Sequence, residues 1–382
     1  MKIIDILTFP VNLAGNHVFV KVLTDEHLYG IGEAYRVGPD HAVDQVVHYF
    51  KDWLIGQDPT RIEHLYRIMY NGSRFPGGSM VNAAISGIEI ALWDLKGKAY
   101  GVPVYQLLGG RCRDRVRVYR GAGGGRTPKE IEDGLRDVIH HQKFTAIKTS
   151  PQPYQFQKMP WGQALRESRM RMETIRRYVG EDVDIALDPH AQIFEPIRAQ
   201  ELAEVVKPFR PMFYEEPLRP ENIAAMGRLR QKIDIPLATG EMLVTKYQFR
   251  DLIAANAADI LQPDLLLCGG LLEGKKIAAM AEAEYLTVAP HNPMGPVSTA
   301  VAAHFAVSTP NFLILEYVPD NEGPSRELIL EPFKYADGWL EVPDKPGLGI
   351  ELNEKAFMGN RGLDRKYRRE LMFDADGNIG FQ

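Results

Sequence analysis

Cysteine is scarce in this chain. Its 382 residues include only Cys112 and Cys268, which stand far apart and form no C-x-x-C motif. Two thiols exclude a disulfide framework and fit a reducing compartment. Long apolar runs are missing too, since no stretch approaches the ~18 uninterrupted apolar residues of a membrane span. The N-terminus, MKIIDILTFPV, has too short an apolar run for a signal peptide, so we expect a cytoplasmic protein.

An excess of charge of one sign is also absent. The formal net charge is −5, with no basic block and no acidic tail, which argues against a nucleic-acid or membrane partner. The apolar fraction of 45% and the charged fraction of 25% are those of an ordinary globular protein. Because single cores stop growing near ~250–300 residues, the length indicates one large domain and a smaller one.

The first part of the chain has a mixed α+β pattern. KIIDILTFPV, HVFVKVLTD and GIGEAY, within residues 1–34, alternate and turn like a small antiparallel sheet. Polar and apolar residues then recur at helical spacing between residues 41 and 109, as in HAVDQVVHYFKDWL. We therefore predict a sheet followed by helices in this region.

A different pattern begins after Asp114. Eight short β-like runs alternate there with helix-like segments, which predicts βαβ units and, with eight of them, a closed parallel barrel. The alternative is an open doubly wound sheet, but the GAGGG segment does not give the G-x-G-x-x-G fingerprint and is interpreted as a loop. The runs span residues 116–123, 144–150, 183–189, 212–217, 235–241, 258–264, 286–291 and 312–317.

Ionisable residues stand at the ends of successive runs. In a barrel the carboxyl ends of all strands open on one face, where active sites are built. One strand-end carboxylate alone commonly has a structural role, such as capping a helix. A whole rim of carboxylates would repel itself without a cation, so we interpret the set as functional. Its members are Lys148, Asp188, His190, Glu215, Glu216, Glu241, Asp264, His291 and Glu316.

Three of these carboxylates form the predicted metal site. Asp188, Glu215 and Glu241 end three consecutive runs, 27 and 26 residues apart. Carboxylates without thiols select a hard divalent cation, Mg²⁺ before Mn²⁺. Glu216 alternates away from Glu215 along the strand, so we interpret Glu216 as structural.

Two histidines and a lysine are predicted to share this face. His190 lies two residues beyond Asp188, and side chains two apart on a strand point the same way. His291 and Asp264 end neighbouring runs, and a carboxylate beside a histidine raises its basicity and fixes its tautomer. Lys148, from the second run, is expected across the barrel from His291.

The chain also resembles a known family along essentially its whole length. AAISGIEIALWDLKGKAYGVPVYQLLGG (83–110) is similar to the first signature of the mandelate racemase and muconate-lactonizing group of the enolase superfamily. LDPH, YEEP, TGE, LQPD, APHNPMGP and LEY then follow in the family's order and spacing, and GLGIEL matches near the C-terminus. Within the group, the chain is most similar to D-galactonate dehydratase and neighbouring sugar-acid dehydratases.

The resemblance implies an α/β fold, a (β/α)₇β modified TIM barrel with an α+β capping domain formed from both termini. We expect the N-terminal part of the cap in residues 1–114, the barrel in 115–324 and the tail that completes the cap in 325–382. The resemblance also implies one Mg²⁺ on the three metal ligands, with Mn²⁺ as a substitute. The implied roles are base for His291, dyad partner for Asp264, acid for His190, intermediate stabilisation for Glu316 and carboxylate contact for Lys148.

These roles imply dehydration of a sugar acid to a 2-keto-3-deoxy acid through an enediolate. Racemases of this group often have K-x-K at the end of the second strand, whereas this chain has Lys148, Thr149 and Ser150. Racemisation needs a base on each face of the carbanion, so the missing second lysine favours elimination. The alternatives are an epimerase or a cycloisomerase on the same scaffold, a non-catalytic scaffold protein and, more distantly, a nucleotide-binding oxidoreductase.

The substrate depends on loops over the barrel mouth, near Asn12–His17, in residues 73–78 and in the proline-rich loop 151–168. D-galactonate is the best single choice of sugar acid. The resemblance further implies a homo-oligomer, an octamer or a dimer. The predicted substrate contacts are Lys148, His190, His291, Glu316, Trp161 and Tyr154.

Overall fold

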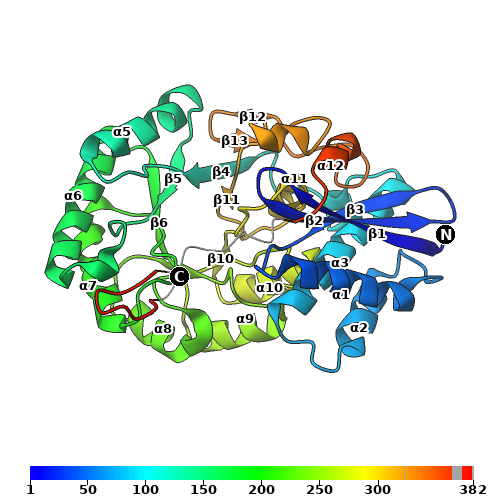
Figure 1. Ribbon diagram of the computed structural model, residues 1–382, viewed down its shortest axis with the longest axis horizontal. Helices are drawn as coiled ribbons and strands as arrows, with labels where there is room; N and C mark the ends of the chain where they lie inside the picture. The colour runs from blue at the N-terminus through cyan, green and yellow to red at the C-terminus, as the bar shows by residue number, and fades with distance from the viewer. Residues whose placement is uncertain (322, 364–371, 381–382) are drawn as a thin grey trace.

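The chain forms a barrel with a second, smaller unit of sheet and helices beside it (Figure 1). The computed structural model describes residues 1–321, 323–363 and 372–380. Residues 364–371 and 381–382 of the predicted tail therefore lie outside the described residues. Within the described residues, no helix is long and apolar enough to cross a membrane.

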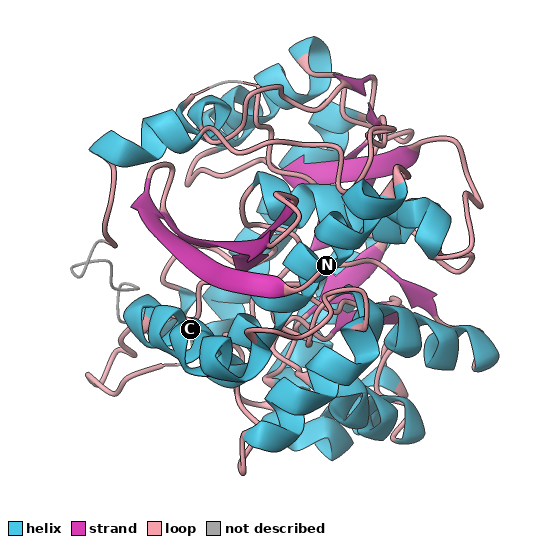
Figure 2. Ribbon diagram, turned by 90° about the vertical axis from the view of Figure 1, so that its right-hand side faces the viewer, coloured by secondary structure: helices cyan, strands magenta, loops and turns pink. Residues whose placement is uncertain are grey.

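The smaller unit, here called the cap, begins with the antiparallel sheet that the alternating pattern predicts. Its strands pair in the order β1-β2-β3, and its long strands curve across the face shown in Figure 2. They are β1 (Ile3–Asn12), β2 (Asn16–Thr24) and β3 (Tyr29–Ala34). The predicted helices follow as α1 (Asp40–Leu54), α2 (Ile62–Gly72), α3 (Ser79–Tyr100) and α4 (Val104–Leu107).

Helix α3 lies unusually close to the cap sheet. A Cβ atom added to Gly32 on β3 would lie 1.9 Å from the carbonyl oxygen of Gly87 on α3, so any side chain at this position would force the helix away. The middle of α3 is buried on all sides, because it packs against β2 and β3 and also touches barrel helix α10. Its polar residues are therefore held in the interior between the two units.

The eight predicted barrel strands are confirmed, although each is shorter than its apolar run. Strands β4 to β10 pair in parallel with their sequence neighbours, and β11 returns to pair with β4. A parallel bridge between Val288 and Phe312 completes the ring. The strands are β4 (Val116–Gly121), β5 (Ala146–Thr149), β6 (Asp184–Leu187), β7 (Phe213–Glu215), β8 (Leu237–Thr239), β9 (Ile260–Leu261), β10 (Thr287–Val288) and β11 (Leu315–Glu316).

A small apolar cluster, separate from the main core, fills the barrel interior. Each strand contributes one buried residue from within the strand or from the position next to it, as a packed barrel requires. This layer forms the floor beneath the strand ends that carry the ionisable residues. Its members are Tyr119, Ala146, Ala186, Phe213, Ala238, Ile260, Ala289 and Ile314.

Seven helical connections join the barrel strands, giving the predicted (β/α)₇β order. The predicted loop 151–168 is shorter than expected, because α6 begins at Trp161, directly after Pro160; proline commonly marks such a helix start. The helices are α5 (Pro128–Arg136) with a π-helical turn (Asp137–His141), α6 (Trp161–Val179), α7 (Pro196–Val206), α8 (Ile223–Arg230), α9 (Thr245–Ala254), α10 (Leu271–Ala283) and α11 (Pro296–Val307).

Short 3₁₀ turns lie in the connections between these helices and strands, and one more lies in the segment after the last barrel strand. They are η2 (Phe156–Lys158), η3 (Lys207–Phe209), η4 (Pro220–Asn222) and η5 (Pro324–Glu327).

The described tail reaches both units. Strands β12 (Tyr335–Ala336) and β13 (Trp339–Leu340) form a hairpin whose second strand pairs with β4. Helix α12 (Glu354–Gly359) packs on the cap sheet, where Phe357 stacks on Phe19 with ring centroids 5.2 Å apart. Residues 372–380 instead lie against the barrel loops after β5 and β6, near α7 and α8 in Figure 1. The domain boundaries predicted between cap and barrel, at residues 114/115 and 324/325, remain predictions.

Candidate active site

The predicted site residues lie at the carboxyl ends of the barrel strands. Lys148 and Glu215 belong to β5 and β7, and Glu316 is the last residue of β11. The others follow their strands within three residues. Six of them are buried and the side chain of Lys148 is only 11% exposed, so the sequence pattern brings ionisable groups together inside the protein. The six are Asp188, Glu215, Glu241, Asp264, His291 and Glu316.

His291 and Asp264 form the predicted dyad. The His291 Nδ1 atom lies 2.9 Å from Asp264 Oδ2, and the other oxygen, Oδ1, accepts the Leu266 amide at 2.8 Å. The Nε2 atom of His291 faces Glu241 at 3.4 Å and Glu316 at 4.0 Å. The dyad therefore orients one imidazole nitrogen and leaves the other toward the carboxylates.

The charges around His291 favour its protonated form. Burial alone would favour the neutral ring, but the carboxylates of Glu241, Asp264 and Glu316 outweigh burial and raise the pKa of His291 to about 10. A general base must be neutral before it accepts a proton. Neutralising the carboxylates near Nε2 would lower this pKa and prepare His291 for that role.

Lys148 lies among the carboxylates. Its Nζ atom is 2.9 Å from Glu215 Oε1, 3.1 Å from Glu316 Oε1 and 3.4 Å from Asp188 Oδ2. These partners raise the pKa of Lys148 well above its usual value, although burial opposes them. Lys148 thus contacts two of the carboxylates that are predicted to bind the cation, Asp188 and Glu215. The sequence predicted its place across the barrel from His291 but not these contacts.

The predicted metal ligands remain short of positive charge. Among the residues that the structure describes, five buried carboxylates share one lysine and one histidine here. The Oε2 atoms of Glu215 and Glu241 are buried without a hydrogen-bond partner, and burial raises the pKa of Glu215 to about 8 even though Lys148 opposes this. Buried carboxylate oxygens without donors are costly unless a cation binds them.

As arranged, the described part of the chain contains no group of three or more His, Cys, Asp or Glu side chains ready to hold a metal ion. The ammonium of Lys148 lies within 3.4 Å of both Asp188 and Glu215. The donor set of three carboxylates, with the two oxygens that lack a hydrogen bond, fits a hard divalent cation.

His190 does not lie on a strand. Strand β6 ends at Leu187, and His190 has a positive φ of 57° in the turn that follows. Its amide donates to Asp188 Oδ1 at 2.7 Å, and its ring is close enough to help lower the pKa of Glu241. The strand-based reason for placing His190 was therefore wrong, but from this turn the residue still acts on Glu241.

Tyr154 and Trp161 have other neighbours. Trp161 is the first residue of α6, and its Nε1 donates to Glu201 on α7 at 2.5 Å. Tyr154 is half exposed, with the guanidinium of Arg126 4.7 Å above its ring. These contacts give Trp161 a role in packing α6 against α7, and substrate contact by either residue stays a prediction.

Sequence analysis missed two residues beside the dyad. Asn292 donates its amide to Glu316 Oε2 at 3.2 Å and its side-chain NH₂ to the Glu316 carbonyl at 2.8 Å. The ring of Tyr35, at the end of β3, lies 6.1 Å from the His291 ring. Asn292 could have been noticed from its place directly after His291, whereas Tyr35 is contributed by the cap, and no sequence signal connected it with the barrel.

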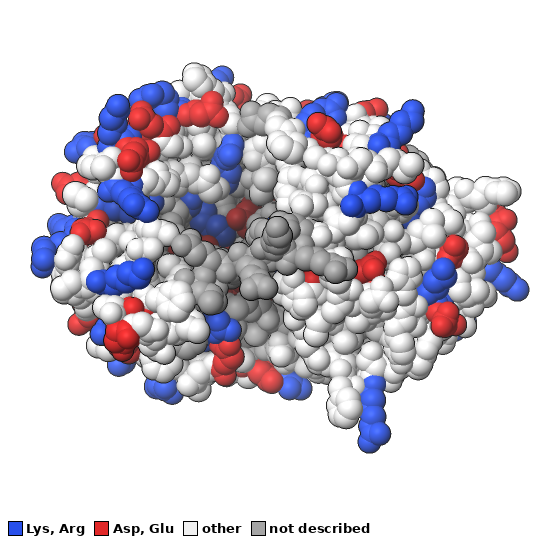
Figure 3. Space-filling view, in the orientation of Figure 1, with Lys and Arg blue, Asp and Glu red and all other residues white. Residues whose placement is uncertain are grey.

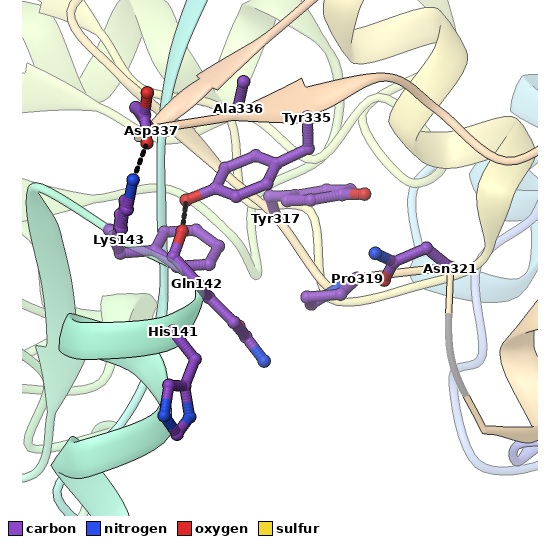
Figure 4. Close-up of a pocket in the computed structure, with 10 residues that line it drawn as sticks. His141, Gln142, Lys143, Tyr317, Pro319, Asn321, Tyr335, Ala336 and Asp337 are labelled. Carbon is purple, nitrogen blue, oxygen red and sulfur yellow. Dashed lines mark hydrogen bonds and ion pairs between the residues drawn. The ribbon is translucent and has the colours of Figure 1, made fainter.

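The molecular surface is hollowed between the two units, with basic and acidic side chains visible inside the hollow (Figure 3). The cleft in Figure 4 is a different feature. It lies between the turn before β5 and the β12–β13 hairpin, where Tyr335 donates to the Gln142 carbonyl and Lys143 pairs with Asp337. It includes none of the predicted site residues, so we do not assign the chemistry to it.

Comparison with known families supports the same assignment. Residues 9–109 match the N-terminal domain of mandelate racemase and muconate lactonizing enzyme, and residues 130–356 match the enolase C-terminal domain-like family. The chain belongs to this family of the enolase superfamily. The two matches cover the cap and most of the barrel, as the expected fold requires.

Individual relatives align along the full length. D-galactonate dehydratases from Verminephrobacter eiseniae and Variovorax paradoxus are 36% and 35% identical, each over 99% of both chains. An enolase structure from Agrobacterium radiobacter, provisionally assigned as a galactarate dehydratase and bound to sodium and L-malate, is 39% identical over 100% of both chains, with a TM-score of 0.95. A provisionally assigned dehydratase from Salmonella enterica is 32% identical, covering 94% of this chain and 98% of its own, with a TM-score of 0.89.

Proposed function

We propose that this protein is a hydro-lyase that dehydrates an aldonate, with D-galactonate as the first choice, to a 2-keto-3-deoxy acid. The observation that carries the proposal is the His291–Asp264 dyad, whose second ring nitrogen, Nε2, faces a rim of buried carboxylates in which the Oε2 atoms of Glu215 and Glu241 make no hydrogen bond. The full-length similarity to D-galactonate dehydratases supports the substrate class.

Asp188, Glu215 and Glu241 would hold the divalent cation, Mg²⁺ first and Mn²⁺ as a substitute. When bound, the cation would supply positive charge against the negative charge that develops on the substrate carboxylate. Glu241, one of its ligands, is also one of the carboxylates that raise the pKa of His291. Loading the site would then bring His291 closer to the pKa that a base needs near neutral pH.

The chain's own residues perform the proton transfers in this proposal. His291 Nε2 takes the proton from C2, while Asp264 keeps the other ring nitrogen hydrogen-bonded. His190 gives a proton to the C3 hydroxyl, whose bond to carbon breaks as water leaves. Lys148 contacts the substrate carboxylate, Glu316 helps to stabilise the enediolate, and the resulting enol tautomerises to the 2-keto acid.

A second candidate substrate is a dicarboxylic sugar acid. The reason is the Agrobacterium radiobacter structure, which is similar over its whole length and is assigned to galactarate rather than galactonate. L-malate, which that structure binds, is itself a dicarboxylate. The two candidates share the reaction at C2 and C3 and differ only at the far end of the substrate.

A substrate screen tests the proposal. The protein is incubated with Mg²⁺ and a panel of aldonates and aldarates in D₂O, and 2-keto-3-deoxy product is measured. We expect turnover of D-galactonate, or of galactarate under the second candidate. Deuterium exchange at C2 without a keto product would instead favour an epimerase.

Light scattering would test the further prediction of an octamer or dimer.

A further inference from the structure

Two buried glutamates of the cap are bonded to the barrel loops that carry the dyad. Glu89 on α3 is fully buried. Its carboxylate accepts the amides of Leu271 at 2.8 Å and Leu272 at 3.0 Å, and the indole N–H of Trp93 at 2.6 Å. Leu271 begins α10, which directly follows the loop that starts at Asp264. Glu89 therefore caps the helix at the far end of the Asp264 loop.

Glu33 does the same for the next loop. It lies on β3, is fully buried, and accepts the amides of Gly295 at 3.1 Å and Ser298 at 3.2 Å. His17, also in the cap, approaches its Oε1 with Nδ1 at 2.8 Å. Helix α11 begins at Pro296, five residues after His291. Glu33 thus caps the helix that follows the His291 loop.

Glycines make room for both carboxylates. A Cβ atom at Gly270, just before α10, would lie 2.1 Å from Glu89 Oε2, and one at Gly295, just before α11, would lie 2.4 Å from Glu33 Oε1. Any other residue at either position would displace the glutamate from the helix end. The same combination of cap glutamate, helix N-terminus and glycine therefore occurs twice, once on each dyad loop.

Smaller contacts reinforce the Asp264 loop. The Ser86 hydroxyl on α3 accepts the Gly269 amide at 3.0 Å. The Tyr35 amide donates to the Leu266 carbonyl at 3.3 Å, and the Leu266 amide in turn donates to Asp264. The backbone of this loop is fixed from the cap side along most of its length.

We propose that Glu33 and Glu89 are positioning residues that align the His291–Asp264 pair from the cap. A carboxylate at a helix N-terminus is held by the free amides and by the helix dipole, and each glutamate holds one dyad loop in this way. The alignment of His291 with Asp264 then depends on the cap being seated on the barrel. This inference rests on the proposed function, because it assumes that the dyad is the base.

Asp94 supplies a matched control. It lies on the same helix as Glu89, is fully buried, and also accepts two amides, from Ile31 at 2.9 Å and Leu348 at 2.7 Å. Ile31 belongs to the cap sheet and Leu348 to the tail. Lys98 on α3 also pairs with Asp94. Asp94 therefore shares the burial and bonding of Glu89 without touching a dyad loop.

The experiment compares Glu33→Gln, Glu89→Gln and Asp94→Asn in the full chain. A glutamine side chain has one acceptor oxygen in place of two and carries an NH₂ donor instead, so the first two variants lose a bond to their loop. We expect kcat on the best sugar acid to fall by about 10- to 100-fold in both, because small misplacements of catalytic groups cost this much. KM and Mg²⁺ affinity are expected to stay within about twofold of the wild type, and Asp94→Asn is expected to keep its kcat.

Amide hydrogen exchange gives a readout that needs no turnover. We expect faster exchange in residues 265–272 of Glu89→Gln and in residues 292–298 of Glu33→Gln, with neither region changed in Asp94→Asn. Gly295→Ala, which pushes Glu33 away while its φ of −86° allows alanine, replaces Glu33→Gln if that variant does not fold.

Equal rates of amide hydrogen exchange in residues 265–272 and 292–298 of all three variants would overturn the inference. Unchanged kcat in both glutamate variants, or an equal fall in Asp94→Asn, would also overturn it. A wild-type protein that turns over no sugar acid would refute the proposed function instead, and the exchange comparison would still decide whether the cap glutamates fix the two loops.

Discussion

Buried carboxylates occur in two regions of this molecule, and the two groups differ in their donors. At the barrel mouth, Glu215 and Glu241 each have a buried oxygen without a hydrogen-bond partner. Between cap and barrel, Glu89 accepts three N–H donors. Burial raises the pKa of both Glu215 and Glu89 to about 8, so burial and pKa alone do not separate them.

The two sets of carboxylates differ in what supplies their hydrogen-bond donors and positive charge. Amide donors supplied by the fold satisfy the cap carboxylates, and the pairing is finished when the chain folds. Within the described residues, the mouth carboxylates share one lysine and one histidine, and the Oε2 atoms of Glu215 and Glu241 make no hydrogen bond, as expected of a site whose charge is completed by a ligand. Four changes test this comparison.

Replacing His291 with asparagine is expected to have the largest effect. Removing a general base typically costs ~10²–10⁴-fold in rate, and we expect a loss of this size in kcat for the best sugar acid. Mg²⁺ affinity is expected to persist, because Asp188, Glu215 and Glu241 are unchanged. Steady-state kinetics and a metal titration check both parts, and loss of metal binding in this variant would contradict the assignment.

Replacing Lys148 with methionine removes the lysine that, among the described residues, pairs with the mouth carboxylates. Breaking a buried ion pair on one side typically costs ~3–5 kcal/mol, so the metal-free protein is expected to lose stability on this scale. Saturating Mg²⁺ is expected to restore most of it, because the cation replaces the lost charge. Urea unfolding with EDTA and with Mg²⁺ measures the difference, and an equal loss under both conditions would count against the metal site.

Stability of the metal-free protein is expected to depend on pH. The folded pKa of Glu215 is about 8, against 4.5 for the free side chain, so the folded state holds an extra proton between these values. Stability therefore falls as pH rises from 4.5 to 8, by an amount on the order of a few kcal/mol. Glu89, whose folded pKa is also about 8, lowers the stability over the same pH range.

Magnesium separates the two contributions. Mg²⁺ is expected to remove the pH-dependent loss of stability that comes from Glu215 and to leave the loss that comes from Glu89. Thermal unfolding between pH 5 and 8, with EDTA or with Mg²⁺, gives the slope of stability against pH under each condition. In Glu215→Gln the slopes are expected to coincide, and a magnesium effect that persisted there would place the cation elsewhere.

Replacing Asp94 with asparagine is expected to have the smallest effect. Asparagine loses the ion pair with Lys98, but Lys98 keeps its second partner, Glu351, so we expect the ~1–3 kcal/mol of a lost buried acceptor, and no ligand replaces it. The fall in melting temperature is therefore expected to be the same with EDTA and with Mg²⁺. A Mg²⁺-dependent fall would show that the cap and mouth carboxylates are not independent.

The barrel and the mouth residues could be predicted from the sequence for one physical reason. A buried parallel strand is an apolar run, and an ionisable residue at its end stands out against that run. The pattern therefore predicts that Asp264, His291 and Glu316 lie at one face. The roles and the cap built from both termini came from the family resemblance rather than from the pattern.

The cap contacts could not be predicted in the same way. Glu89 lies in an almost wholly buried helix, and the sequence did not show which backbone amides it meets 182 residues away. A glutamate within the apolar run ISGIEIALW was the available signal. His190 was misplaced because a strand pattern does not reveal where a turn begins, and the contact of residues 372–380 with the barrel carries no periodic signal.

Equilibrium binding of Mg²⁺ to Glu215→Gln tests the central claim most directly, with Glu89→Gln as the matched variant. Both substitutions remove one buried carboxylate whose pKa burial raises to about 8. We predict that Glu89→Gln binds Mg²⁺ as the wild type does, whereas Glu215→Gln loses at least about tenfold in affinity, which is ~1.4 kcal/mol. Equal affinity in the wild type and in both variants would contradict the account.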